Sequence, residues 1–168
     1  MTFHLPTFDS DDGGWAAMRM TSFLKRSAVL PALTAATRDD AIAELVRAVQ
    51  AAGAFDAAST GDVIAAVLRR EQLGSTGIGR GIAIPHSRHA CVSQLVGGLA
   101  LCPRPEGIAF DAIDGEPVHV MVLLISPQDQ PGHHLRALDS VVQTLRDDAF
   151  LAQLRACKTA DDIWALLT

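Results

Sequence analysis

The chain has 168 residues, of which 49% are hydrophobic and 20% are charged, with a formal net charge of −5 and a pI near 5.6. This length and composition predict one globular domain and exclude a disordered chain. The acidic balance, without a cluster of Lys and Arg, argues against a nucleic-acid partner and an anionic membrane surface. No apolar run approaches the roughly 18 residues of a spanning helix, so we expect no membrane insertion and a cytoplasmic location.

The N-terminal stretch 1–19 contains acidic residues and glycines without periodicity, and we expect a mobile tail there. We expect the folded domain to cover residues 20–168, and Met20 could equally be an alternative start. Three cysteines in the chain lack the C-x-x-C spacing. They therefore predict neither a disulfide framework nor a zinc site. Over the whole sequence we expect no metal and no cofactor.

Two amphipathic helices are predicted first. Thr37 is a plausible N-cap for a helix with apolar residues at i, i+3, i+4 and i+7, and Gly53 stands where a C′ glycine belongs. A second helix begins near Ser59 or Thr60, carries one apolar face and runs to Gly74.

A glycine-rich stretch follows the second helix, from Gly74 to Gly81. Its four glycines predict a loop that turns sharply, because only glycine enters positive φ without a steric penalty. The short apolar run Ile82–Ile84 predicts a buried strand, which Pro85 ends. His86 therefore leaves a strand end at a defined angle, which is a suitable way to present a reactive imidazole.

The second half of the chain alternates strands and helices. Residues 94–102 predict a strand whose two glycines allow a bulge or a close approach, and 117–126 is apolar on both faces, as in a sheet interior. Helices are predicted from about 133 to 146, after Asp147, and after the cap Thr159. We place Leu135 and Leu138 on the buried side of the first of these. The expected fold is a single-domain α/β sandwich with one sheet flanked by helices.

The glycine spacing does not predict a nucleotide site. A dinucleotide fingerprint runs strand, glycines, helix, whereas here the glycines follow a helix and precede a strand. The G-x-x-x-x-G-K-[ST] motif is also missing from the sequence. ATP bound by such a loop is therefore not expected.

Two histidines are the candidate reactive groups, His86 and His134, the latter at the start of a predicted helix where anions are favoured. Taken alone, each is more simply a surface or core-edge histidine. With the glycine stretch and two arginines, they suggest a site for a dianionic group, with one imidazole as nucleophile. Phosphoryl transfer fits this set, and without a Walker motif or an acidic metal cluster the donor is expected to be another protein.

The stretch Gly74–Arg88, preceded by Arg70-Glu71, resembles the mannitol/fructose-type enzyme IIA domains of the bacterial phosphotransferase system, most of all the nitrogen-regulatory enzyme IIA proteins. The segments Ile108–Val118 and His134-Leu135 fit the same family in the same order, so the resemblance covers about residues 28–168. It implies a mixed sheet flanked by helices, which agrees with the fold expected from the patterns alone.

The resemblance also implies a function and a site. It implies that His86 accepts a phosphoryl group from an HPr-like carrier, that His134 is the second active-site histidine, and that Arg70 lies near the phosphoryl group. The partners implied are the HPr-like donor and regulated targets such as kinases or transporters. The expected catalytic residues are His86, His134 and Arg70, and the expected phosphate-binding residues are Ser75, Thr76, Gly77 and Arg88.

Other interpretations stay open. The chain could be a free-standing sugar-system IIA component that passes phosphate to a transporter, or a protein-binding regulator that does not need phosphorylation. A metal site built from His86, His89, His133 and His134 is disfavoured, because their spacing is neither i, i+4 on a helix nor accompanied by carboxylate ligands.

Overall fold

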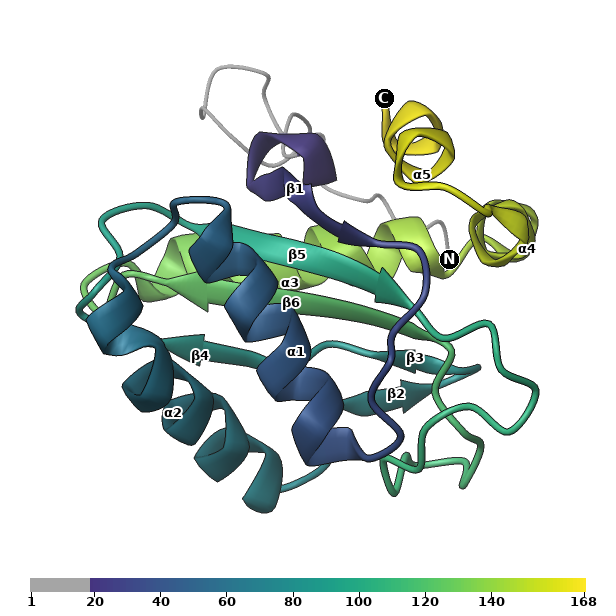
Figure 1. Ribbon diagram of the computed structural model, residues 1–168, viewed down its shortest axis with the longest axis horizontal. Coiled ribbons are helices and arrows are strands. Elements are labelled where there is room, and N and C mark those ends of the chain that lie inside the picture. The colour runs from purple at the N-terminus through teal and green to yellow at the C-terminus, as the bar shows by residue number, and fades with distance from the viewer. Residues whose placement is uncertain (1–18) are drawn as a thin grey trace, which may run out of the picture.

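The computed structural model describes residues 19–168, so the expected mobile tail, apart from Arg19, lies outside the described residues (Figure 1). In this part of the chain, strands and helices alternate around one sheet. The strands are β1 (Leu24–Leu30), β2 (Gly77–Gly79), β3 (Ile82–Ala83), β4 (His86–Arg88), β5 (Val96–Leu101) and β6 (Val120–Ser126). The helices are α1 (Arg38–Ala51), α2 (Thr60–Gln72), α3 (Pro131–Leu145), α4 (Asp148–Ala156) and α5 (Ala160–Leu167), with short 3₁₀ turns η1 (Met20–Ser22) and η2 (Ala57–Ser59).

The sheet is mixed, with the strand order β1-β5-β6-β3-β2. Strand β6 pairs antiparallel with β5 on one side and parallel with both β3 and β4 on the other. The outer pairs are β1 with β5, which is parallel, and β2 with β3, which is antiparallel. The expected α/β sandwich with a mixed central sheet is therefore confirmed.

Two hydrophobic cores lie on opposite faces of the sheet. Met121, Leu123 and Ile125 of β6 pack in the core covered by α1 and α2. The alternate residues of β6 pack in the core covered by α3, α4 and α5. Figure 1 shows the same layers, with α1 and α2 in front of the sheet and α3 behind it. The prediction that this strand is apolar on both faces because it is interior is confirmed; each such side chain contributes about 1.5–3 kcal/mol by its burial.

Strand β6 begins later than predicted, at Val120 and not at Pro117. Val118 pairs instead with Ile108 in an isolated bridge. The N–H groups of His119 and Val120 both donate to the carbonyl of Gly81. The segment before β6 is therefore held by the β2–β3 turn and joins the sheet ladder only at Val120.

The first two helices confirm their predicted ends. The Thr37 side chain accepts from the backbone N–H of Asp40, and Gly53 has φ +88° just after α1. Helix α2 covers Thr60–Gln72, within one or two residues of its expected bounds.

Over residues 19–168, no helix combines the length and apolar character needed to cross a bilayer.

The glycine pair in β5 marks a close approach, as predicted. A Cβ at Gly97 would stand 2.2 Å from the carbonyl oxygen of Leu123 on β6. A Cβ at Gly98 would stand 2.9 Å from both the Ala28 carbonyl oxygen and side-chain atoms of Leu45 and Val49. These two glycines let β1, β6 and α1 pack closely around β5.

Two parts of the fold differ from the sequence prediction. Strand β1 was not predicted, because Lys25, Arg26 and Ser27 interrupt its apolar pattern at the sheet edge. The glycine stretch is not a loop but a β2–β3 hairpin, whose turn residues Gly79, Arg80 and Gly81 all have positive φ. The positive φ expected for this stretch is thus correct, while its conformation on either side of the turn is extended.

Candidate active site

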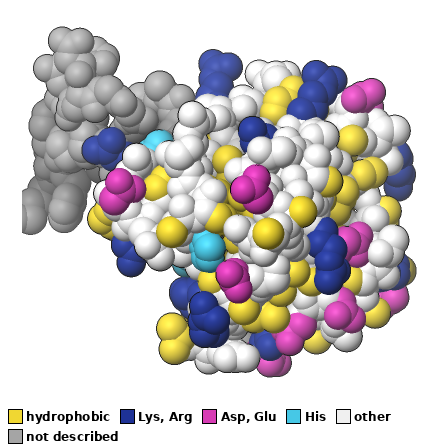
Figure 2. Space-filling view, turned by 60° about the vertical axis from the view of Figure 1, so that its left-hand side comes forward, with side chains coloured by type: hydrophobic (Ala, Val, Ile, Leu, Met, Phe, Trp, Pro, Cys, Tyr) yellow, Lys and Arg dark blue, Asp and Glu magenta, His cyan; other side chains and the backbone are white. Residues whose placement is uncertain are grey.

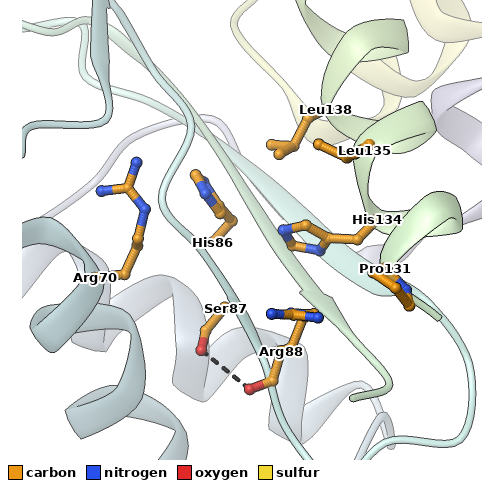
Figure 3. A pocket seen from close by; sticks show the side chains of 8 residues that line it. All are labelled: Arg70, His86, Ser87, Arg88, Pro131, His134, Leu135 and Leu138. Atoms are coloured by element: carbon orange, nitrogen blue, oxygen red, sulfur yellow. Dashed lines mark hydrogen bonds between the residues drawn. The ribbon is translucent and has the colours of Figure 1, made fainter. Parts of the chain in front are cut away.

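His86 and His134 face one another across a cavity between β4 and α3. Their ring centroids are 5.3 Å apart and their planes are tilted by 55°. The cavity has a volume of about 390 Å³. Figure 3 shows the side chains around it, which come from α2, β4 and α3. The lining residues are Arg70, His86, Ser87, Arg88, Pro131, His134, Leu135 and Leu138.

Strand pairing places His86 on the α3 face of the sheet. The sequence predicts a chain leaving the sheet after Pro85, but His86–Arg88 forms β4, parallel to β6. His86 is the register partner of Leu124, and partners in a ladder point to the same face. Leu124 belongs to the core beneath α3, so His86 is directed toward that helix.

The tautomer of His86 follows from its backbone contact. Its Nδ1 lies 2.7 Å from the carbonyl oxygen of Ile84. A carbonyl oxygen only accepts, so Nδ1 carries the proton and Nε2 keeps a lone pair when the ring is neutral. Burial, and secondarily the positive charge of Arg70, hold the pKa of His86 below its ordinary value. His86 is therefore a neutral imidazole with a free Nε2 at neutral pH.

His134 lies in the first turn of α3 and is 8% exposed. Its Nδ1 contacts the hydroxyl of Ser126, the last residue of β6. Burial, with the neighbouring His86 and Arg88, lowers the pKa of His134 to about 4. The ring is therefore neutral at physiological pH, which lets it stand beside His86 without charge repulsion.

The buried stripe of α3 runs through His134 and not through Leu135. Leu135 was predicted on the buried side of this helix, but it is 65% exposed at the rim of the cavity. The helix begins at Pro131, two residues earlier than predicted, and its buried residues are His134, Ala137, Val141 and Leu145. The i, i+3, i+7, i+11 spacing of these four residues identifies the helix face that meets the sheet.

Two arginines supply positive charge to the cavity. Arg70, in the last turn of α2, donates from Nη1 to the carbonyl of Gly74 at 2.9 Å. Arg88, at the end of β4, is exposed and close enough to lower the pKa of His134. Figure 3 shows the guanidinium group of Arg70 beside His86 and that of Arg88 near His134. Cations beside two neutral imidazoles favour an anion in the space between them.

Three predicted phosphate-binding residues do not line the cavity. The Ser75 hydroxyl donates to the carbonyl of Phe110 at 2.5 Å and accepts from the N–H of Gly77 at 3.0 Å. The Thr76 N–H and hydroxyl both donate to the carboxylate of Glu71. These groups hold the β2–β3 hairpin against α2 and the 110–112 segment. Ser75, Thr76 and Gly77 are therefore occupied in local contacts and lie outside the lining of this cavity.

Sequence reasoning missed three groups that shape the site. The Ile84 carbonyl and the Ser126 hydroxyl each contact an imidazole Nδ1, and Ser87 lines the cavity from β4. One signal for Ser126 was available. It is the one polar residue of β6 and shares the α3-facing alternation of Val122 and Leu124.

The histidines outside the cavity have other contacts. His89 Nδ1 accepts from the N–H of Cys91 at 3.0 Å, and His133 Nδ1 lies 3.3 Å from the side-chain oxygen of Gln130. Among residues 19–168, no group of three or more His, Cys, Asp or Glu side chains is arranged to hold a metal ion.

The chain is similar to proteins of nitrogen regulation. It is 34% identical to a nitrogen regulatory protein of Bradyrhizobium diazoefficiens, over 89% of this chain and 95% of that protein. It is 40% identical to one of Escherichia coli strain K12, over 63% of this chain and 64% of that protein.

Solved structures share the fold. The crystal structure of nitrogen regulatory protein IIA-Ntr from Neisseria meningitidis matches with a TM-score of 0.76 and 29% identity, over 88% of this chain and 97% of that one. The crystal structure of IIA mannitol from Escherichia coli matches with a TM-score of 0.70 and 21% identity, over 84% of this chain and 96% of that one. These findings confirm the resemblance drawn from Gly74–Arg88 and from His134. Residues 22–168 match the model of the family described as phosphoenolpyruvate-dependent sugar phosphotransferase system, EIIA 2, and the chain belongs to this family of phosphotransferase components.

Proposed function

We propose that this chain is a phosphohistidine carrier of a nitrogen-regulatory phosphotransferase system. In this proposal His86 accepts a phosphoryl group from an HPr-like protein, and the phosphorylation state regulates target proteins. The supporting observation is the state of His86: a neutral ring with Nδ1 bonded to the Ile84 carbonyl, beside a cavity with two arginines. That arrangement leaves Nε2 as the nucleophilic atom.

The transfer is a displacement at phosphorus. The Nε2 lone pair of His86 forms the new N–P bond while the N–P bond of the donor phosphohistidine breaks, and that electron pair stays on the donor nitrogen. The His86 ring becomes more positive as the bond forms. The Ile84 carbonyl stabilises it through the Nδ1 proton, because a charged donor strengthens the hydrogen bond.

Arg70 and Arg88 stabilise the transferring group in this proposal. Phosphoryl transfer depends mainly on positioning and on stabilising the equatorial oxygens, for which guanidinium groups are well suited. The two guanidinium groups enter from α2 and β4, so they approach the group from different directions (Figure 3). His134 faces the same space from α3.

The rim of the cavity is suited to a protein donor. Leu135 and Arg88 are exposed beside His86, so an incoming protein meets both apolar and cationic surface there. Figure 2 shows one face of the molecule, with basic, acidic and apolar side chains interspersed and no continuous basic stripe. The net charge of −5 and the mixed apolar and cationic rim favour a protein partner with a phosphohistidine over a nucleic acid. We place the exchange in the cytoplasm.

The partners proposed are the HPr-like donor and regulated targets such as kinases or transporters. The names of the relatives support the regulatory role. A solved complex of the same fold, 20% identical to this chain, joins enzyme IIA mannitol to phosphorylated enzyme IIB from Escherichia coli. That complex supports docking of a second phosphotransferase protein on this fold.

Intact-mass measurement after incubation with a phosphorylated HPr-like donor tests the proposal. We expect wild type to gain one phosphoryl group and His86→Ala to gain none. His133→Ala is the matched control, because His133 is an exposed neighbour of His134 that does not line the cavity. Wild type that gains no mass from a donor able to phosphorylate another IIA protein would contradict the proposal.

A second candidate is a free-standing sugar-system IIA component. The chain is 30% identical to part of an Escherichia coli EIIABC component specific for 2-O-α-mannosyl-D-glycerate, matching 22% of that protein. Transfer of label from phosphorylated wild type to a sugar-specific IIB domain would favour this function. Target binding that His86→Ala retains would instead favour a regulator that does not need phosphorylation.

A further inference from the structure

Ser126 is the polar end of an otherwise apolar strand. Residues 120–125 of β6 are hydrophobic, and Ser126 is 0% exposed. A buried hydroxyl without a hydrogen-bond partner destabilises the fold, so the hydroxyl of Ser126 needs a partner. The Oγ of Ser126 is in contact with Nδ1 of His134, and strand alternation turns it to the α3 face with Leu124.

The direction of this hydrogen bond follows from the partners available. The Ser126 hydroxyl has one proton to donate, and within residues 19–168 the Nδ1 of His134 is the partner of its oxygen. If Nδ1 carried the ring proton, the hydroxyl proton would be left without an acceptor. The hydroxyl therefore donates to Nδ1, and the neutral ring carries its proton on Nε2.

We propose that Ser126 is a positioning residue for phosphoryl transfer, holding His134 in the Nε2–H tautomer so that this N–H donates to the oxygens of a phosphoryl group on His86. The inference rests on the proposed function of His86. It makes the two rings complementary: His86 offers a lone pair to phosphorus, and His134 offers a proton donor to the phosphoryl oxygens. No proton leaves either ring in this arrangement.

The contact also fixes the ring orientation. An imidazole on a helix can turn about its last side-chain bond, and the terminal torsion has broad, two-fold preferences. The Ser126 hydroxyl, held by a central strand, binds one ring nitrogen and directs the other away from β6. In Figure 3 the ring of His134 extends from α3 into the space beside His86, as this orientation requires.

Ring-nitrogen NMR of the wild-type protein tests the tautomer without any donor. We expect His134 at pH 7 to show an unprotonated Nδ1 and a protonated Nε2, with a single ring orientation. In Ser126→Ala, the loss of the donor to Nδ1 makes protonation easier, so the pKa of His134 rises above its wild-type value. His86 and Arg88 stay in place in this variant, so the rise reports the lost hydroxyl.

Phosphoryl transfer from the HPr-like donor provides the second measurement. We expect Ser126→Ala to slow transfer at saturating donor about tenfold, the effect of one lost hydrogen bond, with donor affinity unchanged. Thr144→Ala is the matched control, because it removes a hydroxyl that bonds the Ser140 carbonyl within α3 and leaves His134 untouched. Its ring signals and transfer rate should equal those of wild type.

Two results would overturn the inference: a protonated Nδ1 on His134 in wild type, or Ser126→Ala that transfers at the wild-type rate. A wild type that accepts no phosphoryl group would refute the proposed function instead. In that case the NMR measurement would still decide whether Ser126 sets the tautomer of His134.

Discussion

The ring of His86 lies 5.3 Å from the ring of His134, centroid to centroid, although one residue belongs to a strand and the other to a helix far along the chain. Two charged imidazoles at this distance would repel by about 3 kcal/mol at an effective dielectric constant of 20. Burial lowers the pKa of both rings, so the pair is neutral at physiological pH. Protonation of either ring at low pH should therefore destabilise the fold.

We expect the free energy of unfolding to decrease as the pH is lowered, because of His134. Its pKa is lowered from 6.5 to about 4 in the folded state, so the unfolded chain binds more protons between these values. The stability contributed is complete above pH 6.5 and is lost progressively as the pH falls to about 4. The loss should be at most about 2 kcal/mol, because the open side of the cavity screens part of the interaction.

Urea unfolding of wild type and His134→Gln between pH 7.5 and 4.5 measures this effect. The variant should lose less stability over this range than wild type, whereas His133→Gln, at an exposed position, should follow wild type. Parallel pH profiles for wild type and His134→Gln would contradict the prediction.

Arg70→Gln should slow phosphoryl acceptance and raise the pKa of His86. The Arg70 charge is one cause of the lowered pKa of His86, after burial, so its removal should give a partial return toward the ordinary value. Loss of one cation beside the transferring group should slow transfer about tenfold or more. NMR titration of His86 and the transfer rate check the two parts. Arg69→Gln, an exposed neighbour outside the cavity, should change neither.

Glu71→Ala should destabilise the fold by about 2–4 kcal/mol, because it leaves two buried hydrogen-bond donors without an acceptor. Glu71 is 2% exposed and accepts from the Thr76 N–H at 3.0 Å and from the Thr76 hydroxyl at 2.5 Å. Denaturant unfolding measures the loss. Gln72→Ala, at the exposed last residue of α2, should stay within about 0.5 kcal/mol of wild type. Equal stability of the two variants would show that the contact does not hold the hairpin.

Two glycine-to-alanine substitutions should change the stability of the fold in opposite directions. Gly97→Ala places a Cβ 2.2 Å from the Leu123 carbonyl, so we expect about 3 kcal/mol or more of destabilisation. A Cβ at Gly61, in the first turn of α2, has nothing within 4 Å. Gly61→Ala should stabilise the protein by up to about 1 kcal/mol, because alanine loses less backbone entropy in a helix. Thermal unfolding of both variants checks the pair.

Local chemistry in the sequence determined much of this protein. Thr37, Asp147 and Thr159 cap their helices with side-chain oxygens, and each cap acts within three residues of the chain. The apolar run of β6 already implied a strand covered on both faces, since both of its alternating sets of side chains need burial. His86 could be singled out because Pro85 and the glycines precede it in a short stretch.

Only the tertiary structure decided which groups share the cavity. Strand register turned His86 and Ser126 to the α3 face, and the packing of α3 buried His134 while leaving Leu135 at the rim. The hydroxyls of Ser75 and Thr76 donate to the Phe110 carbonyl and the Glu71 carboxylate, and neither residue lines the cavity. Edge strand β1 likewise depends on its pairing with β5. Register and packing join residues that are distant along the chain, and the free energy of those contacts is not encoded in any short segment.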